Sequence, residues 1–174
     1  MSLRSRALVG GIIGGFFGAF IMTIILVASK MMIGLPPLAD FMVMGTYVGG
    51  SGAAVVPAGL AAHFSVGILD GVIFGVLTTT VGTFALTSWA KALALGLTFG
   101  LAAYLLVFLP VSVLGFAPIM MAMMGPSAAG LMTMVQAVAV IEHLIFGLAV
   151  ASVVFVFTRA GMKSGVNQNL HLQP

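Results

Sequence analysis

Four long apolar blocks, at about 8–33, 52–80, 92–117 and 129–158, constrain this chain more than any other feature of its sequence. A helix that crosses a bilayer needs about 20 predominantly apolar residues, and each block is long enough for one. The 174-residue chain is 61% hydrophobic and only 5% charged, whereas soluble domains carry about 25% charged residues. The sequence therefore predicts an all-α integral membrane four-helix bundle, with one transmembrane domain over residues 1–174 and no room for a second, soluble domain.

The distribution of basic residues indicates how these spans are oriented. Basic residues precede the first block, separate the second from the third and follow the fourth, and four spans would place these three regions on one side. They are Arg4, Arg6, Lys91, Arg159 and Lys163, five of the six basic residues in the chain. Because lysine and arginine are enriched in cytoplasmic loops, we expect a multi-pass protein of the cell membrane with both termini in the cytoplasm.

The two halves of the chain resemble each other, with corresponding residues about 80 positions apart. The matching segments are Phe17-Gly18 with Phe99-Gly100, IGLPP (33–37) with LGFAP (114–118), Met44-Gly45 with Met124-Gly125, and HFSVG (63–67) with HLIFG (143–147). This spacing predicts a duplicated helical hairpin, with repeat 1 at about 8–84, repeat 2 at about 88–158 and a polar tail at 159–174. Each unit holds two spans, so both copies would have the same orientation, as in a parallel repeat.

Glycines at four-residue spacing mark the predicted helix-packing faces. They are Gly14 and Gly18 in the first block, Gly67, Gly71 and Gly75 in the second, and Gly96 and Gly100 in the third. Small residues at this spacing allow helix backbones to approach closely in lipid. The alternative is that glycine is simply frequent in membrane helices, which explains isolated glycines better than three registered stripes. Pro110 lies inside the third block and should distort that helix, because proline has no N–H.

Polar side chains within the second and fourth blocks form the predicted site. They are His63, Asp70, Gln136, Glu142 and His143. At 100° per residue, His63 and Asp70 lie about 20° apart around one helix and about 10 Å apart along its axis. Ionisable residues are costly in lipid and usually point into the bundle, so we expect a buried polar layer.

The fourth block places its polar residues on two faces. Gln136 and His143 share one stripe, whereas Glu142 is turned about 100° from His143, toward a neighbouring helix or another subunit. Thr23 and Tyr104 are candidate hydrogen-bond donors to this layer.

Several roles are open for the polar layer. Its members could only fix helix register, or Asp70 or Glu142 could pair with a different protein. His63 and His143 could together ligate a haem or a metal, and Asp70 with Glu142 could line a proton or ion path. Ten of the thirteen methionines lie near the outer helix ends, where thioethers could bind Cu(I) or pack against apolar surfaces.

The sequence holds no motif of an ordinary enzyme. It has no phosphate-binding loop beside a strand, no GxSxG and no HExxH. We therefore expect no catalytic residue and no enzymatic activity. Six Lys and Arg residues are too few for a nucleic-acid surface.

Four glycine-rich stretches carry a resemblance to a known group of proteins. They are GGFFGAFIMT (14–23), GLPP (34–37), HFSVGILDGVIFG (63–75) and EHLIFG (142–147). In these stretches the chain resembles an uncharacterised family of small prokaryotic four-helix membrane proteins that is well represented in archaea. Members of that family look like companions of respiratory oxidases, so the resemblance implies an accessory role.

The leading hypothesis from the sequence is therefore a non-catalytic accessory subunit of a larger membrane redox complex, such as a respiratory oxidase or a copper monooxygenase. Its partners would be other integral membrane subunits and structural lipids, with no cofactor of its own. One alternative is a small transporter or channel that uses Asp70 and Glu142. Another is a membrane protein that binds haem or a metal through His63 and His143.

Overall fold

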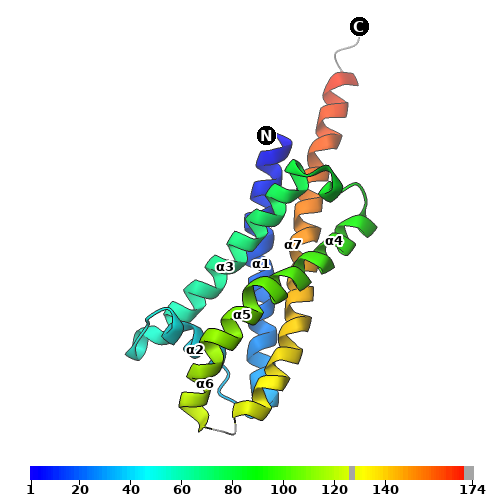
Figure 1. The fold of residues 1–174 in the computed structure, drawn as a ribbon. Helices are drawn as coiled ribbons and strands as arrows, with labels where there is room; N and C mark the ends of the chain where they lie inside the picture. Colours follow the sequence, from blue (N-terminus) through cyan, green and yellow to red (C-terminus); the bar gives the residue numbers. More distant parts are fainter. Residues whose placement is uncertain (126–127, 171–174) are drawn as a thin grey trace.

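The protein is an all-α bundle of long helices in a computed structural model that describes residues 1–125 and 128–170 (Figure 1). Four helical stretches are long and apolar enough to cross a membrane. They are Leu3–Met32, Gly52–Thr80, Trp89–Ala122 and Gly130–Arg159. The predictions of an all-α fold and of four candidate spans are therefore confirmed.

The first two spans are joined by a short helix, and the third is interrupted. The elements run in the order α1 (Leu3–Met32), α2 (Ala39–Tyr47), η1 (Gly52–Ala54), α3 (Val55–Thr80), η2 (Gly82–Phe84) and α4 (Trp89–Ala103). The third span continues through η3 (Tyr104–Phe108), α5 (Leu109–Val111), η4 (Ser112–Phe116) and α6 (Ala117–Met124), and α7 (Ala128–Leu170) is the fourth. Helix α7 includes most of the predicted polar tail, and residues 171–174 of that tail lie outside the described part.

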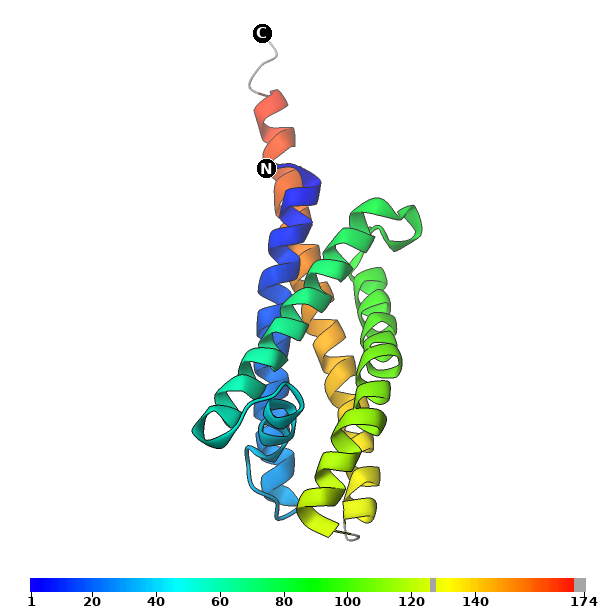
Figure 2. The ribbon, with the colours of Figure 1, turned by 60° about the vertical axis from the view of Figure 1, so that its left-hand side comes forward.

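Helices α1 and α7 form the centre of the bundle, with α3 packed on α1 and α4 packed on α7. Helix α3 ends at the connection 81–88, and the third span begins there. The two helices move apart with increasing distance from this connection (Figure 2). An exact twofold axis between the two hairpins would exchange α1 with α4 and α3 with α7. It would therefore give α3 and α4 a contact as extensive as that between α1 and α7, and the described residues show no α3–α4 contact of that extent. The sequence repeat remains a prediction, while the packing order is α3–α1–α7–α4.

Glycine allows α1 and α3 to approach until their backbones touch. A Cβ on Gly15 would collide with the carbonyl oxygen of Gly67, and a Cβ on Gly71 would collide with the carbonyl oxygen of Gly11. Any side chain at these positions would force the helices apart. Close backbone packing stabilises helix pairs in lipid, where the hydrophobic effect does not drive them together.

The second hairpin, α4 with α7, is joined in the same way. A Cβ on Gly100 would meet the carbonyl oxygen of His143, and one on Gly147 would meet that of Gly96. All seven glycines named from the sequence lie at helix contacts: Gly14, Gly18, Gly67, Gly71, Gly75, Gly96 and Gly100.

The start of α1, the end of α7 and the connection 81–88 lie at one end of the bundle, which we call the terminal end (Figure 1). The guanidinium of Arg159 donates a hydrogen bond to the carbonyl of Thr87 there, and its carbon lies 4.9 Å from the ring centroid of Phe155. The side chain of Lys163 lies outside the described part of the chain. The opposite end carries α2 and is called the α2 end.

We expect Gly15→Ala to lower the melting temperature of the detergent-solubilised protein strongly. The new Cβ meets only backbone atoms of α3, which cannot rotate away, and such overpacking costs about 1–3 kcal/mol. Gly130→Ala is the matched control, because a Cβ on this helical glycine has no heavy atom within 4 Å and removes only backbone freedom. Equal melting temperatures for the two variants would contradict the packing described here.

Candidate functional site: a polar cavity between the spans

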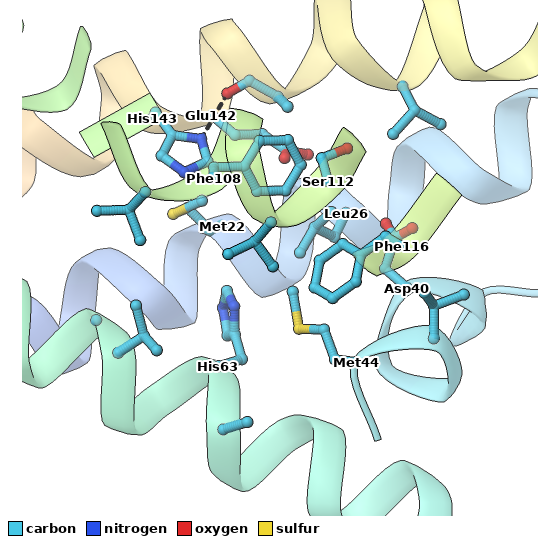
Figure 3. Close-up of a pocket in the computed structure, with 18 of the residues that line it drawn as sticks. Met22, Leu26, Asp40, Met44, His63, Phe108, Ser112, Phe116, Glu142 and His143 are labelled. Carbon is cyan, nitrogen blue, oxygen red and sulfur yellow. Dashed lines mark hydrogen bonds between the residues drawn. The ribbon is translucent and has the colours of Figure 1, made fainter. Parts of the chain in front are cut away.

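A cavity of about 250 Å³ lies between α1, α2, α3, the η3–η4 stretch and α7 (Figure 3). Most of its walls are alanine, valine, methionine and phenylalanine side chains. All three carboxylates of the chain line it, together with one lysine and two histidines: Asp40, Asp70, Glu142, Lys30, His63 and His143. In a chain that is 5% charged, this cavity gathers every acidic side chain.

A buried ion pair connects α1 to α2 at the α2 end of the cavity. Lys30 Nζ lies 2.8 Å from Asp40 Oδ2, and the two side chains are only 2% and 15% exposed. Charges removed from water in this way persist only when they are paired. Burial raises the pKa of the Asp40 carboxyl above its ordinary value, and the ammonium of Lys30 opposes that rise.

The sequence did not predict the contact between Lys30 and Asp40. The available signal was the opposite charge of two residues that flank the same loop, in a chain with only three acidic residues. The contact depends on α2 turning inward, and the mostly apolar sequence of this nine-residue helix does not specify that direction.

Helix α2 forms the wall of the cavity at this end. Phe41 is fully buried, and its ring lies edge-on to that of His63, with centroids 5.5 Å apart. A Cβ on Gly45 would collide with the carbonyl oxygen of Val55, so α2 crosses the start of α3 at backbone distance. The positive φ of Gly49, +87°, turns the chain from α2 toward α3.

The two histidines line the cavity from α3 and α7 (Figure 3). His63 Nε2 lies 3.0 Å from the carbonyl oxygen of Ala19, and His143 Nδ1 lies 2.7 Å from that of Ala139. A carbonyl only accepts, so these two nitrogens carry the protons. In the neutral rings His63 Nδ1 and His143 Nε2 therefore keep their lone pairs.

The geometry does not favour the haem or metal hypothesis for these two rings. The cavity between the helices has a volume of about 250 Å³, at the small end of ordinary small-molecule sites, which span roughly 300–1,000 Å³. Among the described residues no group of three or more histidine, cysteine or carboxylate side chains is arranged to hold a metal ion. Ligation by His63 and His143 gains no support from this geometry.

Glu142 is buried inside the chain, with a side chain only 2% exposed. It lines the cavity from α7 and lies within electrostatic range of Lys30 and Asp40. Its side chain therefore faces the helices that surround the cavity within this chain. Within the described part of the chain its Oε1 has no hydrogen-bond partner.

Asp70 occupies a different part of the same cavity. It lies on α3, seven residues beyond His63 toward the terminal end, and its side chain is only half-buried. Its neighbours Val66 and Leu69 are 46% and 58% exposed. Asp70 thus lies at the rim of the cavity, and Glu142 lies in its interior.

Gln136 lies beside the cavity and holds one of its walls. Tyr104 Oη donates to Gln136 Oε1 at 3.0 Å, and Gln136 Nε2 donates to Ser112 Oγ at 2.6 Å. Tyr104 therefore donates to Gln136, a member of the predicted polar layer. The other expected donor, Thr23, bonds instead to the carbonyl of Ala19 in its own helix.

The distortion expected at Pro110 takes the form of two π-helical segments, η3 and η4, on either side of it. A π-turn holds more residues than an α-turn, which changes the face that each side chain occupies. Phe108, Ser112, Phe116 and Met120, four residues apart, all line the cavity. Sequence reasoning missed Ser112 because regular α-helical periodicity does not anticipate this change.

No protein family, curated protein or solved structure matches this chain. What the site can do therefore follows from its geometry. It offers an interior carboxyl, a rim carboxyl and two imidazole lone pairs inside apolar walls.

We expect Asp40→Asn to destabilise the protein by about 3–5 kcal/mol, because it leaves the buried Lys30 ammonium without its partner. The double variant Lys30→Met, Asp40→Leu removes both charges and should recover most of this loss. Unfolding in a graded detergent or denaturant series measures both, with Arg4→Met at the exposed start of α1 as the control. A double variant as unstable as Asp40→Asn would show that the pair is not what holds α2.

Proposed function

We propose that this protein is a small membrane transporter that binds its solute in the cavity between α1, α2, α3, the η3–η4 stretch and α7. The observation that carries this proposal is the convergence of Asp40, Asp70 and Glu142 on one cavity within the spans. Ionisable residues at such depth cost about 3 kcal/mol each on insertion scales, and they typically mark substrate or ion pathways.

The three carboxylates would have different roles. Asp40 is neutralised by Lys30 and holds α2 in place. Asp70 at the rim would attract the solute, and Glu142 in the interior would bind it. Helix α3 has its main contacts with α1 and α2, so its side toward the third span borders the cavity.

The accessory-subunit hypothesis loses one of its reasons in this geometry. Glu142, the side chain that would pair with a partner, is buried within the chain. The exposed apolar residues on the spans, such as Phe16, Ile24 and Leu106, are what lipid requires and do not distinguish a partner subunit from the bilayer. The resemblance to companions of respiratory oxidases is the support that remains for that role.

The proposed setting is the cell membrane, with both termini in the cytoplasm. Arg4, Arg6 and Lys91 belong to segments at the terminal end (Figure 1), and Arg159 is tied to the connection 81–88 there. Positive residues favour the cytoplasmic side, so the α2 end would face outward.

Proton flux into sealed vesicles containing the purified protein tests the transport proposal. We expect the unmodified protein to dissipate an imposed pH gradient, alone or together with a solute from a panel of inorganic cations, amines and amino acids. Glu142→Gln should reduce the flux about tenfold or more, because the amide cannot carry a proton or pair with a cation.

Gly130→Ala, far from the carboxylates in the chain and without contacts at its new methyl group, should leave the flux unchanged. The absence of any flux of protons or of the panel, in vesicles where the protein is shown to be folded and inserted, would refute transport.

A further inference from the structure

The unpartnered Glu142 restricts what the cavity can bind. A buried carboxyl without a partner is stable either in its neutral form or beside a positive charge. Lys30, the one lysine or arginine among the described residues that line the cavity, is already paired with Asp40 at 2.8 Å. An anionic ligand would face Asp70 and Glu142 with no further lysine or arginine of the described cavity wall to receive it.

A divalent metal cation suits the cavity poorly as well. Divalent ions such as Ca²⁺ take six to eight oxygen ligands, and Mg²⁺ keeps several waters. Here the walls are mainly apolar, Asp70 lies at the rim, and the described residues contain no cluster of three metal-ligating side chains.

An aromatic wall stands on the side of the cavity formed by α2 and the third span. It consists of Tyr47, Phe116 and Phe108, whose neighbouring ring centroids are 5.5 and 6.3 Å apart, and Phe108 is 5.0 Å from the ring of His143. Aromatic faces attract organic cations and pack against apolar bodies. Phe108 and Phe116 line the same cavity as Glu142 (Figure 3).

We propose that the cavity binds an organic ammonium with an apolar body, whose charged group pairs with Glu142 and whose body lies against the aromatic wall. This inference rests on the proposal that the cavity is the solute site. An apolar cavity of about 150 Å³ holds benzene. The cavity of about 250 Å³ therefore has room for one aromatic ring and a short aminoalkyl chain.

Glu142 would carry a proton when the cavity is empty and the ammonium when it is filled. On binding, the O–H bond of the carboxyl breaks, the proton leaves to water, and the ammonium donates its hydrogen bonds to the carboxylate; no electrons are transferred. The groups around this exchange are Lys30 of α1, Asp40 of α2, His63 and Asp70 of α3, Tyr104 of η3 and His143 of α7. Proton and solute would therefore compete for one carboxyl, which couples their movements.

Binding of 2-phenylethylammonium to the full chain in dodecyl maltoside micelles, measured by calorimetry, tests this proposal. We expect binding with release of about one proton, detected with an indicator dye in weakly buffered solution. The neutral 2-phenylethanol has the same shape and should bind about tenfold to a hundredfold more weakly, and the anionic 3-phenylpropionate should not bind. Equal affinities for the ammonium and the alcohol would overturn the proposal.

The Glu142→Gln variant should lose the preference for the ammonium and the proton release together, while Asp70→Asn should keep the proton release. If Glu142→Gln does not fold, the ligand series on the unmodified protein still decides the matter.

A competition experiment distinguishes a free solute from a lipid headgroup. Displacement of the probe by short-chain phosphatidylethanolamine at lower concentration than by free amines would identify a lipid headgroup as the ligand and overturn a free solute. Ammonium binding without vesicle flux would refute transport alone, whereas flux of another solute without ammonium binding would refute this inference alone.

Discussion

The ion pair between Lys30 and Asp40 is the interaction on which the cavity depends. Asp40 is the charged residue of α2, and its bond to the last turn of α1 holds this helix inside the α2 end of the bundle. Helix α2 in turn lies between α3, which it crosses at Gly45, and the third span, where Tyr47 packs on Gly115. It therefore keeps α3 and the third span apart at this end, and the space between them is the cavity.

The other constraint acts along α1 and α3. Gly11, Gly15, Gly67 and Gly71 bring these helices to backbone contact, which leaves no room for side chains between them. Helix α3 is held against α1 at these glycines, and α2 lies between α3 and the third span at the α2 end. Together these two contacts fix the angle of α3, so that it diverges from the third span (Figure 2).

The sequence predicted the parts of this structure that depend on local properties. The spans follow from apolar length, and His63 and Asp70 share a face because their seven-residue spacing fixes the angle between them. What Glu142 faces depends on the packing order α3–α1–α7–α4, which helical periodicity does not contain. The Lys30–Asp40 pair requires the inward position of α2, and Ser112 requires the π-turns around Pro110. Neither the position of α2 nor the π-turns can be read from regular helical periodicity.

Glu142 differs from the other polar side chains that this bundle encloses. Gln136 uses both ends of its amide, Thr78 and Thr158 bond to carbonyls of their own helices, and both histidines donate to backbone oxygens. The fold thus supplies hydrogen-bond partners to these enclosed polar groups, as is usual because buried polar groups are rarely left unpaired. Among the described residues Glu142 Oε1 has no such partner, and an ammonium bound as proposed would supply one. A ligand that binds only the folded protein stabilises it, so this bond would contribute to affinity and to stability together.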